Sequence, residues 1–308
     1  DQAAVMVFFS GIALTFFRIV SFAHDRCSGR IIAASWTHYL AYVFFFPQFR
    51  HGPIERYAQL APQLENARQA WRGSDGVAGL LRILTTYVAL IVAAVIFVGL
   101  GRLTGVAERV TDLAAAVRNP QNLSLVDVAV LVHMPVFLLY ALEWASAGLQ
   151  LAVARVFGVR GSENFDRLWL ARNPPDYWRR WQTTLGAWIQ DYAFRPLARR
   201  TRNPYIAIAL ACIYCGLLHG PQLRCVAWGV YNGLTVAAAS WWLHKRSSRN
   251  RGAPPPSPLR AVLGGIAGRL GLLIWMSVGM TLLVDPDGCG LPLLARYVEL
   301  LAAAVVGR

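Results

Sequence analysis

The stretch "LLRILTTYVALIVAAVIFVGL", residues Leu80–Leu100, decides the class of this protein. It is apolar along nearly its whole length, and a helix needs about 20 mainly apolar residues to cross a bilayer. The sequence has further apolar stretches of this kind at Ala3–Phe22, Ile31–Gln48, Val126–Phe157, Tyr205–Leu218, Val226–Leu243, Ala261–Val284 and Leu291–Val306. Tyr205–Leu218 is short enough to be re-entrant, and Pro135 is expected to kink or divide Val126–Phe157. We therefore predict an all-α polytopic membrane protein with about eight spans or re-entrant segments.

The composition agrees with a membrane protein. Hydrophobic residues make up 56% of the chain, charged residues make up 15%, and the mean hydropathy is +0.41. The net charge of +14 would suggest a nucleic-acid partner in a soluble protein, but basic residues also mark cytoplasmic loops. If each stretch crosses once, the loops Arg50–Gly79, Val159–Asn203 and Lys245–Arg260 share one side and hold 18 Lys or Arg, against six in the other loops. We predict that the basic loops are cytoplasmic and expect no nucleic-acid partner.

The segment "KRSSRNRGAPPPSP", Lys245–Pro258, is basic and then proline-rich, which is typical of a linker. It suggests a main body of residues 1–244, a cytoplasmic linker of residues 245–260 and a C-terminal transmembrane hairpin of residues 261–308. The hairpin is expected to turn at "DPDGCG", Asp285–Gly290. The first residues lack an initiator Met and open in an apolar stretch, so we expect a processed chain or part of a longer one.

The longest basic loop contains "RNPPDYWRRWQTTLGAWIQDYAFRPLARRTRNP", Arg172–Pro204. Asn173 is a plausible N-cap and Pro174 a plausible first helical residue. At 100° per residue one face gathers Trp178, Trp181, Leu185, Trp188, Ile189 and Tyr192, which predicts an amphipathic interfacial helix. Gln182 falls within this aromatic face, where a buried carboxamide without a partner costs about 1–3 kcal/mol. We expect either that the face opens to water or, preferably, that Gln182 has a polar partner inside the protein.

Two other stretches combine apolar runs with titratable groups. In "YVFFFPQFRHGPIERY", Tyr42–Tyr57, the chain turns at Gly52–Pro53 beside His51, Glu55 and Arg56, although interfacial anchors at a span end would look the same. In "GLLHGPQLRCVAWGVYNG", Gly216–Gly233, His219 lies between two apolar stretches, and Gly220–Pro221 should end the preceding helix. A histidine there can exchange protons near neutral pH, or its ring can simply bond a backbone carbonyl.

Together these three stretches resemble the bacterial branch of the membrane-bound O-acyltransferase family. Its motifs "FFPQ…GPI-R", "FWRRWH…W-RDY-Y-PL" and "GLWHG…WG–HG" correspond here to "FFFPQFRHGPIERY", "YWRRWQTTLGAWIQDYAFRPL" and "GLLHGPQLRCVAWGVYNG", in the same order and spacing. Upstream, "GIALTFFRIVSFAHD" looks like the helix before the first motif, so the resemblance covers about Gly11–Ser240. Similar members are acetyltransferases of alginate and other exopolysaccharides, and D-alanyl transferases of teichoic acid.

The resemblance implies transfer of an acyl group, acetyl by preference, from a thioester co-substrate such as acetyl-CoA to a hydroxyl of an exported or lipid-linked glycan. It implies no bound metal or cofactor. His219 matches the family's active-site His and would be the general base. Gln182 stands where the family commonly has His, Asn or Asp, and its amide could orient the substrate or stabilise an oxyanion. The expected substrate-binding residues are Trp178, Arg179, Arg180, Trp181, Asp191, Tyr192, His51, Glu55 and Arg56, with Arg199 and Arg200 for donor phosphates.

The resemblance further implies a multi-pass protein of the bacterial cytoplasmic membrane, and an extracytoplasmic partner protein that receives the acyl group first. Two other functions stay open at this point. The departure at Gln182 is compatible with a catalytically inactive scaffold. A transporter or proton relay would also place polar groups in broken spans, but the sequence shows no symmetric halves, and Glu143 is its one clear intramembrane carboxylate.

Overall fold

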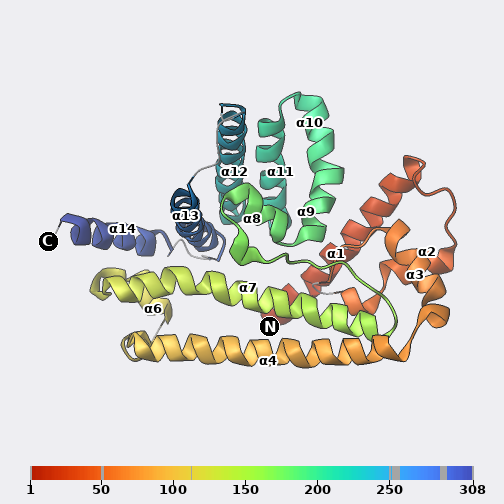
Figure 1. Cartoon of the computed structure of the whole chain (residues 1–308), viewed down its shortest axis with the longest axis horizontal. Coiled ribbons are helices and arrows are strands. Elements are labelled where there is room, and N and C mark those ends of the chain that lie inside the picture. Colours follow the sequence, from red (N-terminus) through yellow and green to blue (C-terminus); the bar gives the residue numbers. More distant parts are fainter. Residues whose placement is uncertain are drawn as a thin grey trace. The chain divides into compact units, whose positions relative to one another are not determined.

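A computed structural model of the chain describes residues 2–49, 52–111, 113–249, 251, 257–284 and 290–306. Most of these residues are helical, which confirms the predicted all-α class (Figure 1). The longer helices are α1 (Gln2–Cys27), α3 (Tyr57–Ala70), α4 (Gly73–Leu103), α7 (Leu125–Val156), α11 (Pro204–Leu218), α12 (Leu223–Arg249), α13 (Pro258–Val284) and α14 (Gly290–Val306). The shorter ones are α2 (Trp36–Val43), α5 (Val106–Arg109), α6 (Leu113–Arg118), α8 (Pro174–Arg180), α9 (Thr183–Ile189) and α10 (Arg195–Thr201), with short turns η1 (Phe46–Gln48), η2 (Pro120–Asn122), η3 (Leu168–Leu170) and η4 (Gln190–Phe194).

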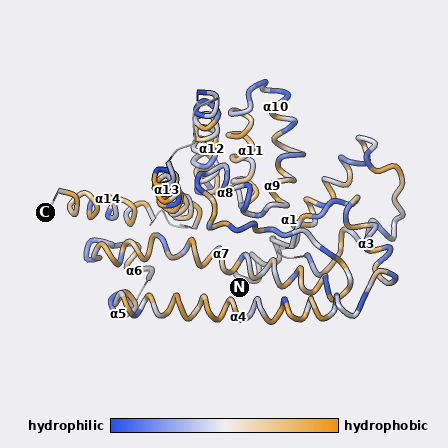
Figure 2. The backbone as a smooth tube through the Cα atoms, in the orientation of Figure 1, coloured by the Kyte–Doolittle hydropathy of each residue, from blue (hydrophilic) through white to orange (hydrophobic). Residues whose placement is uncertain are grey.

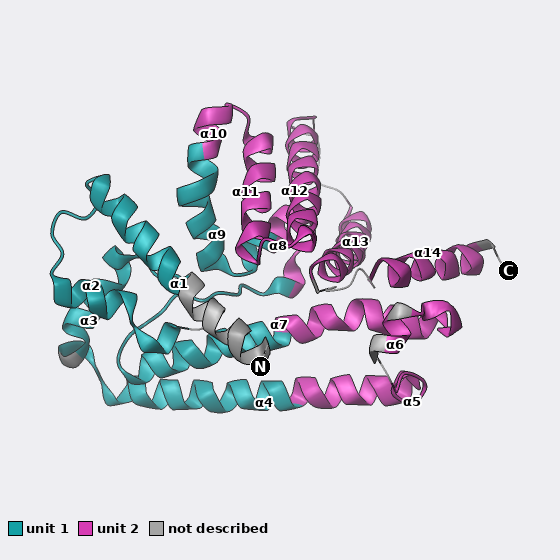
Figure 3. Cartoon of the chain, turned by 180° about the vertical axis from the view of Figure 1, so that it is seen from behind, with its two compact units in different colours: residues 1–91, 141–168, 178–196 teal, residues 92–140, 169–177, 197–308 magenta. Residues whose placement is uncertain are grey.

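The chain divides into two compact units, each built from discontinuous segments (Figure 3). Unit 1 comprises residues 1–91, 141–168 and 178–196, and unit 2 comprises residues 92–140, 169–177 and 197–308. Helices α4 and α7 each contribute to both units.

Three helices of the described chain are long and apolar enough to cross a membrane: α4, α7 and residues Pro258–Leu283 of α13. Helix α11 is apolar but shorter, and the long apolar runs are visible along α4 and α7 in Figure 2. Only 6% of the apolar window of α4 is buried. Its exposed residues include Leu84, Val88, Ile91 and Val95, whose spacing follows one helical face. Such an uncovered apolar surface fits contact with lipid, so the membrane class holds, while the predicted number of about eight spans stays a prediction that the described residues do not confirm.

The predicted span Ile31–Gln48 is wrong. Its helical part is α2, which begins after Ser35, whose side chain accepts a 3.2 Å hydrogen bond from the backbone N–H of His38. It ends at Val43, and the buried Arg18 guanidinium donates to the carbonyl oxygens of Tyr42 (3.0 Å) and Val43 (3.3 Å). An eight-residue helix rises only about 12 Å, too little to cross the hydrocarbon core.

This correction leaves the predicted side of the basic loops unchanged. Without a crossing at Ile31–Gln48, the loop Ala23–Arg30 joins the side of the three basic loops. Arg26 and Arg30 are then counted with the three basic loops, which brings that side to 20 Lys or Arg, against four on the other side. The cytoplasmic placement of Lys245–Arg260 therefore stays a prediction, and it does not depend on the lost span.

Two further boundaries differ from expectation. Helix α7 is one continuous element with Pro135 inside it, not two pieces, since neighbouring groups in a membrane can satisfy the carbonyl that a proline leaves free. Helix α12 runs to Arg249, so the first residues assigned to the linker continue the helix. Of the expected turn Asp285–Gly290, residues 285–289 lie outside the described residues, and Gly290 begins α14.

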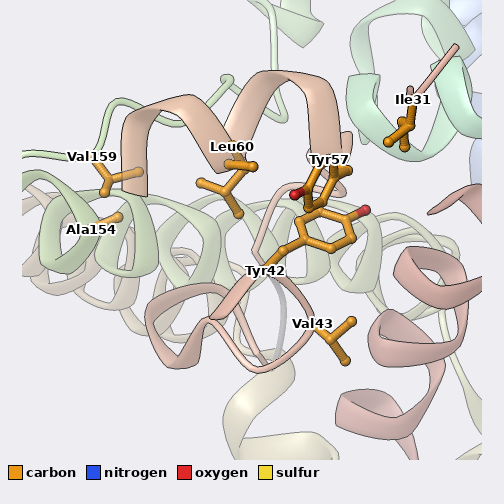
Figure 4. Close-up of a cluster of buried hydrophobic side chains, with 8 residues drawn as sticks. Ile31, Tyr42, Val43, Tyr57, Leu60, Ala154 and Val159 are labelled. Atoms are coloured by element: carbon orange, nitrogen blue, oxygen red, sulfur yellow. The ribbon is translucent and has the colours of Figure 1, made fainter. Parts of the chain in front are cut away.

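The core of unit 1 joins α2 and α3 to α7 and the loop that follows it (Figure 4). It is formed by Ile31, Tyr42, Val43, Tyr57, Leu60, Ala61, Ala154 and Val159. The Tyr42 hydroxyl donates to the backbone oxygen of Glu55 over 3.0 Å. Beside it, the Arg18 guanidinium donates to the Gln48 side-chain oxygen over 3.1 Å, with both residues buried. These contacts fix the segment that leads into Glu55 and Arg56.

In unit 2 a polar cluster ties three helices together. His133 of α7 lies 2.7 Å from the Ser277 hydroxyl of α13 and 2.8 Å from the Tyr297 hydroxyl of α14. The Ser277 hydroxyl donates its proton to the backbone oxygen of Leu273, so it accepts from Nδ1–H of His133. A neutral imidazole then accepts from Tyr297 at Nε2, and every polar group of the cluster has a partner.

Candidate functional site

The predicted amphipathic helix begins as expected but breaks in the middle. Helix α8 starts at Pro174, and the Asn173 side chain accepts a 2.9 Å hydrogen bond from the backbone N–H of Asp176, which confirms the N-cap. The helix ends at Arg180, and Gln182 adopts a left-handed conformation with φ 45° and ψ 54°. Gln182 therefore does not lie on a continuous aromatic face, and that part of the prediction is wrong.

An extended segment that contains Asn164 and Phe165 binds the chain at this break and keeps the helix from continuing. Trp181 pairs in antiparallel fashion with Phe165, and their rings meet edge to face at 5.1 Å. The backbone N–H of Thr183 donates to the Asn164 carbonyl over 2.9 Å, and the Thr184 hydroxyl donates to the Asn164 side chain over 2.5 Å. Residues that would continue the helix thus hydrogen-bond to the segment containing Asn164. This tertiary pairing outweighs the helical pattern of the sequence.

Gln182 has a polar partner, as the sequence led us to expect. Its side-chain nitrogen donates to Glu143 Oε2 of α7 over 3.0 Å, and both side chains are half-buried. A left-handed residue other than glycine costs about 1–3 kcal/mol, and such strain concentrates at functional sites. The sequence analysis noted Glu143 only as an isolated carboxylate. A carboxylate in an apolar span needs a polar partner, and this need could have indicated that Glu143 belongs to a polar contact such as the one with Gln182.

A second cluster in unit 1 brings together Arg56, Asp191 and Tyr192, three of the predicted substrate residues. The Arg56 guanidinium lies 3.2 Å from the Asp191 carboxylate and 4.9 Å from the centre of the Tyr192 ring. The Tyr192 hydroxyl donates to Asp25 Oδ2 over 2.8 Å. Burial, and next the bond to Asp25, raise the pKa of the Tyr192 hydroxyl well above its ordinary value. The hydroxyl therefore stays protonated and acts as a donor.

The remaining predicted residues of unit 1 are distributed along the same segments. Glu55 is buried and accepts from the Ser162 backbone N–H (2.5 Å) and hydroxyl (3.2 Å), which anchors the loop. Arg180 lies 3.3 Å from the Asp166 carboxylate, while Trp178 and Arg179 lie on α8. His51 lies outside the described residues. In unit 2, Arg199 and Arg200 are in the last turn of α10.

His219 lies in unit 2 at the end of α11, as the sequence predicts. It is the C-cap residue of that helix, and its backbone N–H bonds to the Gly216 carbonyl over 3.0 Å. Gly220 follows with φ 142°, a conformation that side chains disfavour. The imidazole is exposed, with its ring centre 5.2 Å from that of Trp228 in an edge-to-face arrangement. An exposed histidine held at a helix end can meet a substrate hydroxyl.

The two helices that flank His219 contact each other backbone to backbone. A side chain at Gly216 would collide with the Cys225 carbonyl, at Gly229 it would lie 2.9 Å from Ile213 Cα, and at Gly233 it would lie 2.7 Å from the Ala209 carbonyl. Sequence reasoning missed this role of the glycines. Gly229 and Gly233 are four residues apart, a spacing typical of closely packed membrane helices, and this was the signal that could have shown it.

We expect Gly229→Ala to lower the free energy of unfolding by about 1–3 kcal/mol, because the added methyl group forces α11 and α12 apart. Thermal unfolding in detergent measures the change. Gly264→Ala on α13 is the matched control, since nothing lies within 4 Å of the methyl group added there. Equal midpoints for the two variants would contradict the close packing of α11 against α12.

Comparison with known proteins gives a family for this geometry. Residues 28–251 match the sequence model of MBOAT, the membrane-bound O-acyltransferase family, and the match ends within the predicted linker. The chain is 22% identical over 258 residues to a teichoic acid D-alanyltransferase of Streptococcus thermophilus, covering 79% of this chain and 59% of that protein. It is 23% identical over 234 residues to a probable alginate O-acetylase of Pseudomonas fluorescens, covering 74% and 44%.

A peptidoglycan O-acetyltransferase of Helicobacter pylori is also similar, with 23% identity over 217 residues, which cover 68% of this chain and 39% of that protein. The chain thus spans about half the length of the curated relatives it matches. The family match covers well over half of this chain and includes the three motifs quoted above together with His219 and Gln182. With the apolar helices already described, it shows that the chain is an integral membrane protein that belongs to the membrane-bound O-acyltransferase family.

Proposed function

We propose that this protein is an O-acyltransferase that moves an acyl group, acetyl by preference, from a cytoplasmic thioester such as acetyl-CoA to a hydroxyl of an exported or lipid-linked glycan. The observation that carries this proposal is the family match over residues 28–251, which includes the exposed His219 at the end of α11. The names of the relatives point to alginate, peptidoglycan and teichoic acid as their acceptors. An acceptor of that kind, reached directly or through an extracytoplasmic partner protein, is therefore the preferred one here.

In the proposed reaction His219 is the general base. Its imidazole takes the proton of the acceptor hydroxyl while the hydroxyl oxygen attacks the thioester carbonyl carbon. The carbon–sulfur bond breaks as the new ester forms, and the leaving thiolate takes up the proton from the imidazolium. A thioester is already activated, so this scheme needs no metal or other cofactor. The exposure of the His219 ring supports this role, because a base has to meet its substrate.

Gln182 is proposed to bind the thioester carbonyl. Its amide nitrogen carries two hydrogens, and the one directed at Glu143 fixes which way the amide points. The second hydrogen can then donate to the carbonyl oxygen as negative charge develops on it. Glu143 joins the proposed site on this argument as the residue that orients Gln182.

Basic and aromatic residues of the matched motifs are proposed to hold the donor. Arg179, Arg180, Arg199 and Arg200 suit its phosphate groups, because a guanidinium binds phosphate through paired hydrogen bonds. The ion-paired cluster of Arg56, Asp191 and Tyr192, with Trp178, Trp181, Glu55 and His51, is proposed to shape the substrate region. In this proposal the basic loops face the cytoplasm of a bacterial cell, where acyl-CoA is made.

Membrane vesicles supplied with acetyl-CoA labelled in the acetyl group test the proposal. Label should pass to a cell-envelope polymer in vesicles with the native chain, and not in vesicles with His219→Ala. The rival function is a catalytically inactive scaffold, which the departure at Gln182 favours. Intact protein in the membrane without transfer of label from acetyl-CoA or another thioester would establish the scaffold and exclude the enzyme.

A cysteine introduced at Ser248 should be cytoplasmic. Ser248 lies in the last turns of α12, among the basic residues that mark that side. After replacement of the five native cysteines, we expect a membrane-impermeant thiol reagent to label Ser248→Cys only in opened cells. Thr104→Cys, in the loop after α4, is the matched position on the opposite side and should react in intact cells. The reverse pattern would overturn the orientation.

A further inference from the structure

The cytoplasmic end of α12 carries cations along one helical face. Trp242, Lys245, Arg246 and Arg249 follow the spacing i, i+3, i+4 and i+7, which places them on the same side of the helix. The four side chains line a surface pocket of about 240 Å³. This pocket is in unit 2, at the end of α12 remote from His219.

The charges of this pocket are not neutralised by acidic side chains. No ion pair of the described chain involves Lys245, Arg246 or Arg249. The sequence from Tyr192 to Val284 contains no Asp or Glu at all, so no carboxylate near in sequence competes for these cations. Three adjacent positive charges repel each other unless an anion lies between them. The pocket is therefore suited to a negatively charged group.

Two tryptophans beside the pocket indicate its depth relative to the lipid headgroups. Lys245 Nζ lies 4.8 Å from the Trp241 ring centre, and the Arg246 guanidinium lies 5.2 Å from that of Trp242. Both rings are about half exposed, at 48% and 51%. Exposed tryptophans at the end of an uncharged stretch, here Val226–Leu243, favour the boundary between hydrocarbon and water. Cations directly beyond them reach the phosphate groups of the cytoplasmic leaflet.

We propose that Trp242, Lys245, Arg246 and Arg249 form a binding site for the headgroup phosphate of an anionic phospholipid in the cytoplasmic leaflet. The phosphate lies between Lys245 and the two guanidinium groups, and the Trp242 ring packs against the glycerol part of the lipid. This site is separate from the proposed acyl-transfer residues and does not depend on catalysis, whereas its assignment to the cytoplasmic leaflet rests on the proposed orientation of the chain. A soluble phosphate compound offers the same charge, but it lacks the acyl chains that hold a lipid at the depth of the tryptophans.

The chain contains a built-in reporter for this site, since Lys245 is the only lysine in its sequence. The experiment uses the full chain in nanodiscs of phosphatidylcholine, with or without phosphatidylglycerol. An amine-acylating reagent is added, and mass spectrometry follows modification of the Lys245 peptide. We expect phosphatidylglycerol to slow the reaction, because a bound phosphate covers the amine. Inorganic phosphate or CoA added to phosphatidylcholine nanodiscs should leave the rate unchanged.

A variant pair separates a built site from a general effect of the anionic surface. Arg246→Gln with Arg249→Gln keeps the reporter and should weaken headgroup binding roughly 30-fold, since each cation near an anionic surface contributes roughly fivefold. Arg251→Gln with Arg260→Gln removes the same charge nearby and should keep the protection by phosphatidylglycerol. Equal loss of protection in both pairs, or no protection in the native chain, would overturn the proposal. Protection by CoA or inorganic phosphate instead would assign the pocket to a soluble phosphate compound.

Discussion

Replacing His219 by Ala should abolish acyl transfer while the protein still inserts into the membrane and unfolds at an unchanged temperature. General-base catalysis contributes about 10²–10⁴ in rate, so the transfer rate of the variant should be at least about 10² lower than that of the native protein. The fold should tolerate the change, since the imidazole is exposed and α11 ends through the backbone of His219 and Gly220. Transfer of labelled acetyl from acetyl-CoA in membranes measures the loss.

Two comparisons make this result specific. His244→Ala removes another exposed imidazole from the same unit and should leave the transfer rate unchanged. Imidazole added to the His219→Ala variant should restore part of the rate, because a small base can occupy the vacated position. Turnover of His219→Ala within about tenfold of the native rate, or 1.4 kcal/mol of barrier, would exclude His219 as the general base.

Exchanging the side chains of Gln182 and Glu143 separates their contribution to stability from their contribution to catalysis. Gln182→Glu places two carboxylates at hydrogen-bonding distance and should destabilise the fold as well as stop transfer. The double variant Gln182→Glu with Glu143→Gln restores one donor and one acceptor in reversed order. We expect it to recover the native unfolding temperature but to remain about 10²–10³ slower, the cost of losing one oxyanion donor.

The double variant gives a decisive result in either direction. If it transfers acetyl at the native rate, the amide of Gln182 is needed only for packing, and His219 acts without help from this segment. Gln182→Leu is a less informative variant, since a leucine at φ 45° adds backbone strain to any loss of chemistry. Gln182→Asn is the better single substitution, because asparagine tolerates the left-handed conformation and keeps an amide at a shorter reach.

Local signals in the sequence predicted the parts of the site that depend on local chemistry. Asn173 starts α8 as an N-cap because its side chain bonds a backbone N–H three residues on, and Gly220 ends the turn at His219 because it adopts a positive φ. The polar partner of Gln182 was also expected, because a buried carboxamide needs one.

The errors came from contacts between residues far apart in the chain. The helical pattern around Gln182 continues through the break, and only its pairing with the segment of Asn164 disrupts it. The stretch Ile31–Gln48 looks like a span, but Arg18 binds the carbonyls at the end of α2. Glu143 could not be matched to Gln182 from periodicity, because 39 residues separate them. Hydrophobic patterns report which face is apolar, and they do not report which partner a polar group finds.

The two ends of α7 determine how thick a bilayer this protein fits. Asp127, near the start, lies 2.6 Å from Arg109, and Arg155, at the end, lies 2.8 Å from Asp75. Asp127 and Arg155 are 28 positions apart, which a helix rising 1.5 Å per residue extends to about 42 Å. That length equals the hydrocarbon core together with both headgroup layers, about 40–45 Å, so each ion pair meets water when the helix stands nearly upright. In a thinner bilayer either α7 has to tilt or the bilayer has to thicken locally around it. Short-chain lipids should therefore strain the protein by hydrophobic mismatch.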